Sequence, residues 1–172
     1  FDQAVVPAKF ITTKRIQCTS PPHSTGHVEI SVSSNNQNFF GVVDLFEYTP
    51  IASLVQVHPN RGPVDGGTFV SVFGHKFHER SAALFYLTCR FNITAVPAMF
   101  ISSNEVKCYT PEMPEGLVAL SVSNNGADYT SPITFEYRRV RLLRLEPSEG
   151  PIAGGTHVVV VGNGCFTPGD TF

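Results

Sequence analysis

The chain has 172 residues, with 12 Lys or Arg against 14 Asp or Glu, so its formal net charge is −2. It lacks the basic surplus that duplex-binding proteins use to displace counterions, which argues against nucleic acid as a partner. No apolar run approaches the length of about 18 residues that spans a bilayer, so membrane contact is expected only through segments outside this stretch.

The first strands read along the chain are residues 27–33 and 45–48. In residues 27–33 apolar and polar side chains alternate, which predicts a strand with one solvated face. Further on, residues 53–57 predict a strand stopped by Pro59, and residues 68–73 predict a strand ended by Gly74. Residues 60–67 between them hold the glycines, proline and aspartate of a turn.

The second half of this stretch continues the pattern. Residues 83–91 predict a strand, residues 97–101 and 105–108 shorter ones, and residues 117–123 an alternating strand with one apolar face. Asn125-Gly126 is the strongest short hairpin signal, and residues 133–137 predict the closing strand. About seven short strands in fewer than 90 residues are typical of a two-sheet sandwich. No segment shows the period of 3.6 residues that would predict an amphipathic helix instead.

The chain repeats itself with a period near 90 residues. Pro59, Gly62-Pro63 and Gly66-Gly67-Thr68 recur 88 residues later, from Pro147 to Thr156, and Cys18 recurs 90 residues later as Cys108. This arrangement predicts the back half of one unit in residues 1–48, a complete unit in 50–137, and the front half of another in 140–172. The sequence is therefore expected to be a segment of a longer array, joined by short links after Tyr48 and Tyr137.

An ordered set of motif positions covers nearly the whole of residues 51–137: Pro59, Gly62, Pro63, Gly66-Gly67-Thr68, Val70, Val72, Gly74, Phe77, Cys89-Arg90-Phe91, Val106-Lys107-Cys108, Pro111, Val122-Ser123-Asn124-Asn125-Gly126, Tyr129, Phe135 and Tyr137. At these residues the chain resembles the IPT/TIG family, the immunoglobulin-like modules of plexins, Met-type receptors, fibrocystin-like ectodomains and some transcription factors. The resemblance implies an all-β fold of tandem immunoglobulin-like sandwiches, one complete and two partial. It weakens at Gly162–Phe166, where Cys165 stands near the place of Phe77.

The pairing of the four cysteines would indicate whether the protein folds in an oxidising or a reducing compartment. The resemblance implies that Cys89 and Cys108 lie on adjoining strands and form a disulfide, with Cys18 at the Cys108 position of the preceding unit. The alternative is a pair of buried thiols in a reducing compartment. The partners of Cys18 and Cys165 stay open.

Two surface features are candidates for binding or modification. Asn92-Ile93-Thr94 is an N-glycosylation sequon just after the strand that carries Cys89. Arg138, Arg139, Arg141 and Arg144 form the densest basic cluster, where Arg139 and Arg141 would share one face of a strand. This cluster could dock an acidic partner surface, a sulfated glycan or a neighbouring chain, or it could be a solvated face that protects a strand edge from aggregation. The exposed contact candidates are Phe39-Phe40 and Phe85-Tyr86.

No catalytic, cofactor or metal site is expected. His75 and His78 beside Glu79 lack the further ligands that zinc requires, and neither a nucleophile motif nor a phosphate loop occurs. The favoured interpretation is a non-catalytic structural or adhesion module of an extracellular or cell-surface glycoprotein, such as a receptor stalk or filament subunit. Its expected partners are other protein chains or copies of itself, bound through sheet edges and loops. The alternatives are spacer modules of a secreted enzyme and the dimerisation domain of a Rel-like DNA-binding protein.

Overall fold

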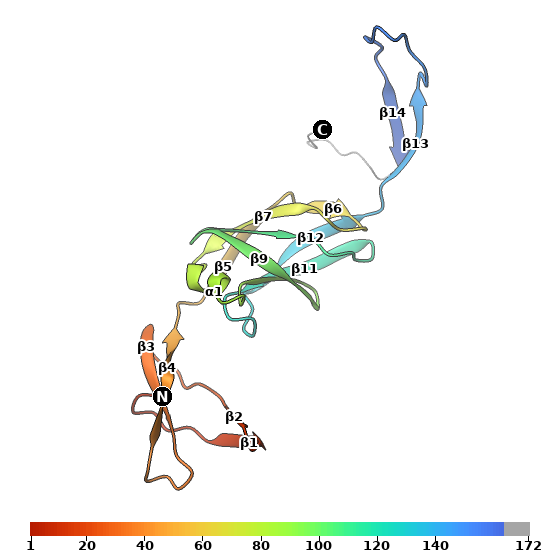
Figure 1. The fold of residues 1–172 in the computed structure, drawn as a ribbon. Helices are drawn as coiled ribbons and strands as arrows, with labels where there is room; N and C mark the ends of the chain where they lie inside the picture. Colours follow the sequence, from red (N-terminus) through yellow and green to blue (C-terminus); the bar gives the residue numbers. More distant parts are fainter. Residues whose placement is uncertain (164–172) are drawn as a thin grey trace. The chain divides into compact units, whose positions relative to one another are not determined.

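The computed structural model describes residues 1–163. The chain divides into two compact units, a first unit, Phe1–Pro50, and a second unit, Ile51–Phe172. Strands dominate both, and the only helix in the described residues is the five-residue α1 (Glu79–Ala83) (Figure 1). The predicted all-β class is confirmed. The described part contains no helix long and apolar enough to cross a membrane, and Cys165 lies outside it.

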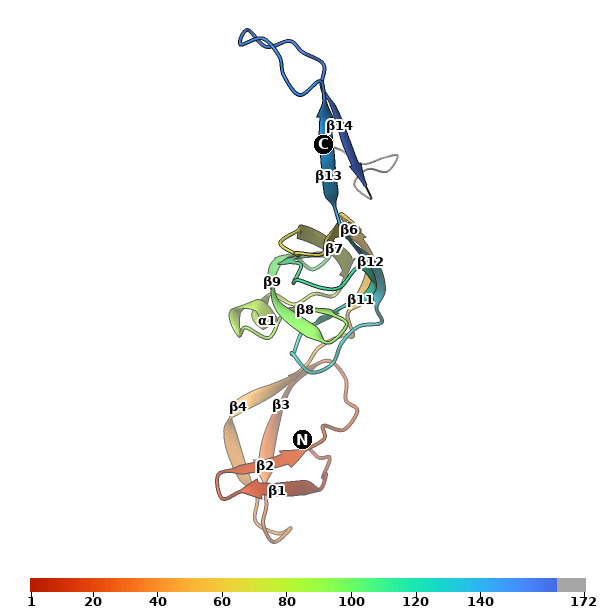
Figure 2. The same ribbon diagram turned by 90° about the vertical axis from the view of Figure 1, so that its right-hand side faces the viewer.

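Eight strands of the second unit form a β-sandwich, which we call the central sandwich. Hydrogen bonds join them in the order β5-β7-β10-β9-β8-β11-β12-β6. Strand β9 changes partner along its length, because residues 94–97 pair with β8 and residues 98–102 pair with β10. The sheet therefore folds into two layers at β9 (Figure 2). The strands are β5 (Ser53–His58), β6 (Arg61–Pro63), β7 (Phe69–His75), β8 (Thr88–Phe91), β9 (Thr94–Ser102), β10 (Glu105–Tyr109), β11 (Gly116–Ser123) and β12 (Ile133–Arg138).

The core of the central sandwich is formed by alternate side chains from both layers. On β11 the predicted apolar face, Val118, Leu120 and Val122, is buried. The opposing layer contributes Val70 and Val72 from β7, and Val106 and Cys108 from β10. Three rings, Phe91, Phe135 and Tyr137, pack edge to face with centroids 5.1 to 6.3 Å apart. The period-2 pattern of the sequence thus places these side chains in one core.

The structure corrects several predicted elements. Residues 83–91 are not one strand, because α1 ends at Ala83 and β8 begins at Thr88. The chain between β7 and β8 buries Phe77 and Leu87, and this packing outweighs the local strand propensity. Residues 61–63 of the predicted turn form β6, which pairs in parallel with β12.

The hairpin predicted at Asn125-Gly126 is wrong in its length. Strand β11 ends at Ser123 and β12 begins at Ile133, and the wider loop is held by Asn125 Oδ1, which accepts hydrogen bonds from the backbone N–H groups of Ala127 and Asp128. The outer face of β11 is also less exposed to solvent than its alternation predicts, since Ser121 and Ser123 are buried. The loop turns back toward this strand, where the Thr130 N–H donates to the Val122 carbonyl.

Four strands form the first unit, in two antiparallel pairs: β1 (Ala8–Thr12) with β2 (Arg15–Cys18), and β3 (Gly26–Val32) with β4 (Phe40–Tyr48). The β1–β2 pairing has the register of β9–β10 moved by 90 residues, bulge included. A separate hairpin, β13 (Arg141–Glu146) with β14 (Val159–Asn163), has the register of β5–β7 moved by 88 residues, bulge included. The sequence repeat is thus matched by a repeat of backbone pairing.

Candidate functional site

A disulfide links the two layers of the central sandwich. Cys89 on β8 and Cys108 on β10 are bonded, with their Cα atoms 6.5 Å apart. Both residues are almost fully buried, at 0% and 1% exposed. Their strands each pair with a different half of β9 and so belong to different layers. The bond therefore staples the sandwich across its core and is closed to external thiols.

A hydrogen-bonded network ties one end of the central sandwich together. Gly66 and Gly67 both have positive φ, and the Gly67 N–H donates to the Thr110 carbonyl at 2.8 Å. The next carbonyl, that of Pro111, accepts a hydrogen bond from the Tyr137 hydroxyl at 2.9 Å. Burial raises the pKa of Tyr137 to about 12, although a hydrogen bond with the Thr110 side chain acts in the opposite direction. The phenol of Tyr137 is therefore neutral at physiological pH, and its hydroxyl donates a hydrogen bond that stabilises the fold.

The sequon residue Asn92 lies in the tight turn between β8 and β9. It has a φ of 53°, and its Oδ1 accepts a hydrogen bond from the backbone N–H of Ala119 at 3.0 Å. Asn92 and Thr94 are exposed, and Ile93 between them is 94% exposed. The sequon thus lies on an accessible turn, and the hydrogen bond to Oδ1 fixes the orientation of the Asn92 side chain.

The arginine cluster is divided between two strands and their link. Arg138 ends β12 and Arg141 begins β13, whereas Arg139 lies in the link rather than on a strand. The expected common strand face of Arg139 and Arg141 is therefore absent. Arg138 forms a 2.9 Å ion pair with Glu136, and Arg144 pairs with Glu146. Local carboxylates thus offset part of this positive charge.

The histidines have ordinary polar surroundings. His75 Nδ1 lies 3.4 Å from Asn104 Oδ1, and the backbone N–H of His78 donates to Asn124 Oδ1. Within residues 1–163, no three His, Cys, Asp or Glu side chains are grouped so as to hold a metal ion.

Exposed aromatic side chains occur both where the sequence indicated and where it did not. Phe39, Phe40, Phe85 and Tyr86 are exposed, as their positions suggested, and Phe85 is 92% exposed at a positive φ. The sequence reading missed a ring pair on the outer face of β7 and β10, where Phe69 and Tyr109 lie opposite each other with centroids 4.7 Å apart. Their odd-numbered positions, alternating with the buried Val70 and Cys108, were the available signal.

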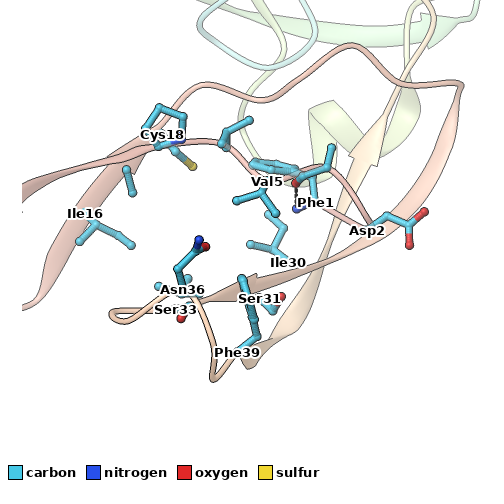
Figure 3. Close-up of a pocket in the computed structure, with 15 residues that line it drawn as sticks. Phe1, Asp2, Val5, Ile16, Cys18, Ile30, Ser31, Ser33, Asn36 and Phe39 are labelled. Carbon is cyan, nitrogen blue, oxygen red and sulfur yellow. Dashed lines mark hydrogen bonds between the residues drawn. The ribbon is translucent and has the colours of Figure 1, made fainter.

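The first unit carries a hollow on one apolar side, which we call the open face. It consists of Ile16, Cys18, Ile30, Val32 and Phe39, which line a hollow of about 560 Å³ (Figure 3). Their counterparts 90 residues later include Val106, Cys108, Leu120 and Val122, all 0% or 1% exposed. In the first unit Ile16 is 48% exposed, Val32 is 39% exposed and the Cys18 thiol is free. Side chains with the pattern of a sandwich core thus face solvent.

The comparisons with known proteins agree with this architecture. A model of the IPT/TIG domain matches residues 52–137. Mouse plexin-A2 is 30% identical over 172 aligned residues, which cover 91% of this chain and 8% of that protein. Human fibrocystin-L is 26% identical over 160 residues, which cover 88% of this chain and 4% of that protein. The chain therefore spans less than a tenth of the length of these curated relatives.

A solved structure shows the same fold. The extracellular region of plexin A4 matches with a TM-score of 0.53 at 21% identity, over 94% of this chain and 14% of that one. The expected immunoglobulin-like fold and the expected extracellular or cell-surface location are confirmed. With the model matched over 52–137, half of the residues, the chain belongs to the IPT/TIG domain family.

Proposed function

We propose that the chain is a non-catalytic structural module of a larger cell-surface or secreted glycoprotein, built as a tandem array with units at residues 1–48, 50–137 and 140–172. Its role is to hold loops and sheet edges at fixed spacing in a receptor stalk or extracellular filament. The observation that carries the proposal is the recurrence of strand register at offsets of 88 and 90 residues.

Specific contacts recur with the strands. The Tyr48 hydroxyl donates to the Pro21 carbonyl at 2.8 Å, as the Tyr137 hydroxyl donates to that of Pro111. Phe1 packs edge to face on Phe46 at 5.5 Å, as Phe91 packs on Phe135 at 5.7 Å. Such pairs are side-chain interactions of a particular sandwich core rather than of strands in general. They support the assignment of residues 1–48 as the back half of a unit like 50–137.

The repeated turn at the start of each unit supports the third unit. A Cβ on Gly62 would lie 2.5 Å from Thr68 Oγ1, and a Cβ on Gly150 would lie 2.6 Å from Thr156 Oγ1. Both glycines are thus needed for the close approach of a threonine six residues later.

The buried disulfide favours this proposal over an intracellular Rel-like dimerisation domain, since such bonds persist in oxidising compartments. The exposed Asn92 turn fits addition of an N-glycan in the same compartment. For Arg138, Arg139, Arg141 and Arg144 we favour a charged face that limits strand aggregation, because Arg138 and Arg144 pair with glutamates of their own strands. The proposed partners are other protein chains, including copies of this one.

The experiment is secretion of the 172-residue chain from animal cells, followed by peptide mapping without reduction. We expect a peptide that joins Cys89 to Cys108 and a glycan on Asn92. In a matched variant, Thr94→Ala removes the sequon but retains the Asn92 side chain, and it should abolish the glycan without changing the disulfide. Free thiols at Cys89 and Cys108 together with an unmodified Asn92 would contradict the proposal.

A further inference from the structure

The side chain of Asn92 extends the pairing of β8 with β11 by one residue. The last pair of the two strands is Phe91 with Leu120, so the next residue of β11 on this side is Ala119. The backbone N–H of Asn92 donates to the Ala119 carbonyl at 2.8 Å, and Asn92 Oδ1 accepts from the Ala119 N–H at 3.0 Å. The carboxamide thus replaces the backbone carbonyl of a continuing strand. Its Nδ2 corresponds to the backbone nitrogen of the next residue of that strand.

Strand β11 has a free edge just before Ala119. Along a strand the backbone groups of successive residues point to opposite sides. Those of Ala119 point toward β8, and those of Val122 point to the other side, where they bond to Thr130 ahead of β12. The N–H and C=O of Leu117 therefore point to the side of β8, which has already turned away. Within residues 1–163 no strand pairs with Leu117 on that side, because β8 covers only Leu120–Ser123.

The side chain beside this free edge is apolar and open to solvent. Leu117 is 73% exposed, and with Ala119, Pro132 and Thr134 it lines a shallow hollow of about 170 Å³. A strand edge that carries an exposed apolar side chain is normally covered or charged, because it invites pairing with another chain. A group that combines an amide with apolar surface would satisfy the backbone of Leu117 and cover its side chain.

The first unit has the same turn without a sequon. Asp2 has a φ of 49°, and its N–H donates to the Glu29 carbonyl at 3.0 Å, which is the backbone contact of the β8–β9 turn moved by 90 residues. An aspartate cannot receive an N-glycan. The counterpart of Leu117 in that unit is His27, which is polar and lies 3.7 Å from Glu47. The fold therefore does not require an apolar side chain at this position, and the leucine occurs where the turn carries a sequon.

We propose that the first N-acetylglucosamine of an N-glycan on Asn92 lies along the free edge of β11 and covers Leu117. The inference rests on the proposed function, which assigns the glycan to Asn92. The sugar is attached to Nδ2, so it leaves the turn along the path of a continuing β8 and passes beside Leu117. Its acetamido group offers the amide N–H and C=O that the edge lacks, and its ring covers the leucine side chain.

The occupant is the glycan of the same chain because its attachment atom belongs to the residue that already bonds this edge at Ala119. The hydrogen bond to Oδ1 restricts rotation of the carboxamide, so the direction of the first sugar is set before it reaches Leu117. A covalently attached group also needs no second molecule to bind, and it covers the edge at any protein concentration. The glycan thus protects the sheet edge in place of a strand.

The first test is hydroxyl-radical footprinting, read by mass spectrometry, of the 172-residue chain secreted from animal cells. An endoglycosidase trims the glycan so that Asn92 carries a single N-acetylglucosamine. The comparison is Thr94→Ala, which lacks the glycan but retains the Asn92 side chain. We expect the oxidation of Leu117 to fall at least about threefold in the glycosylated chain, because most of its exposed apolar surface is removed from water.

Ile93 is the internal control for this measurement. It is 94% exposed and follows Asn92 directly, but the chain runs from it into β9, on the opposite side of β8 from β11. Its oxidation should stay close to that in Thr94→Ala. Protection of Ile93 equal to that of Leu117, or no protection of Leu117 beside a glycosylated Asn92, would overturn this inference alone. An Asn92 without any glycan would instead refute the glycan of the proposed function and the inference with it.

The second test is a double-mutant cycle in urea unfolding. The single N-acetylglucosamine should raise the urea midpoint relative to Thr94→Ala, and Leu117→Ser should reduce that rise by about half or more, because the sugar then has no apolar side chain to cover. Thr94→Ala also loses the hydrogen bond to Met113 Sδ, and the cycle cancels this loss because it occurs in both backgrounds. The matched control Ile93→Ser keeps the sequon and should leave the rise unchanged. An equal rise with and without the Leu117 side chain would refute the contact.

Discussion

The glycine pair at the end of the central sandwich gives a sharp test of how the fold is held. Gly66 has a φ of +73°, and a Cβ added there would lie 2.6 Å from the Pro111 carbonyl carbon and 2.7 Å from the Thr110 oxygen. Gly67 has a φ of +76°, yet no heavy atom lies within 4 Å of its added Cβ. The two positions share the same backbone cost and differ in available space. Gly66→Ala and Gly67→Ala therefore form a matched pair.

The magnitudes follow from these contacts. An alanine at positive φ costs about 1–2 kcal/mol, which applies to both variants. In Gly66→Ala the overlap is with backbone that no rotamer change relieves, at about 1–3 kcal/mol. The displaced Pro111 carbonyl also accepts the Tyr137 hydroxyl, and weakening that bond adds about 1 kcal/mol. We expect a loss of about 3–6 kcal/mol in the free energy of unfolding for Gly66→Ala.

The expected loss for Gly67→Ala is only about 1–2 kcal/mol. The measurement is urea unfolding followed by far-UV circular dichroism, since the chain has no tryptophan to report by fluorescence. The loss expected at Gly66 is a large share of the stability of a domain of this size. Two variants within about 0.5 kcal/mol of each other would refute the close packing of the turn on residues 110–111.

Three further results are expected for the central sandwich. Raising the pH from 10 to 12 should destabilise the chain by about 2 kcal/mol more than it destabilises Tyr137→Phe, because the folded state keeps the phenol protonated after the unfolded state has lost its proton. Equal pH profiles would contradict this. Joint replacement of Cys89 and Cys108 by alanine should lower the free energy of unfolding by about 3 kcal/mol, as measured in urea, since the bond closes a loop with a sequence separation of 19. Leu120→Ala should lower the free energy of unfolding of the second unit by about 2–5 kcal/mol, whereas the counterpart Ile30→Ala should leave it unchanged. A loss at Ile30 equal to that at Leu120 would contradict the division into units.

The sequence was informative where local pattern and tertiary contact agree. Alternation along residues 117–123 placed Val118, Leu120 and Val122 in the core, and the repeat placed Cys18 and Cys108 at equivalent positions. The resemblance to IPT/TIG modules, rather than any spacing, implied the pairing of Cys89 with Cys108. That pairing depends on β8 and β10 meeting across two layers, which no local signal encodes.

The missed features of the fold depend on long-range packing. The change of partner within β9 follows from how two layers meet at residues 97–98, and the pairing of β6 with β12 joins segments more than 70 residues apart. Helix α1 interrupts a stretch of strand-like residues because Phe77 and Leu87 on either side of it are drawn into the core. Ser121 and Ser123 have polar side chains that predict a solvated face, but the loop after β11 turns back toward this strand and both are buried.

Hydrogen exchange followed by mass spectrometry most directly tests the account of this chain as successive IPT/TIG units. The measurement is made on the oxidised 172-residue chain at low concentration. The account predicts a cooperative block of slow exchange over residues 51–138, with fast exchange across the open face of residues 1–48 and across residues 141–163. Uniformly slow exchange over residues 1–163, lost in a single transition as denaturant is added, would contradict it.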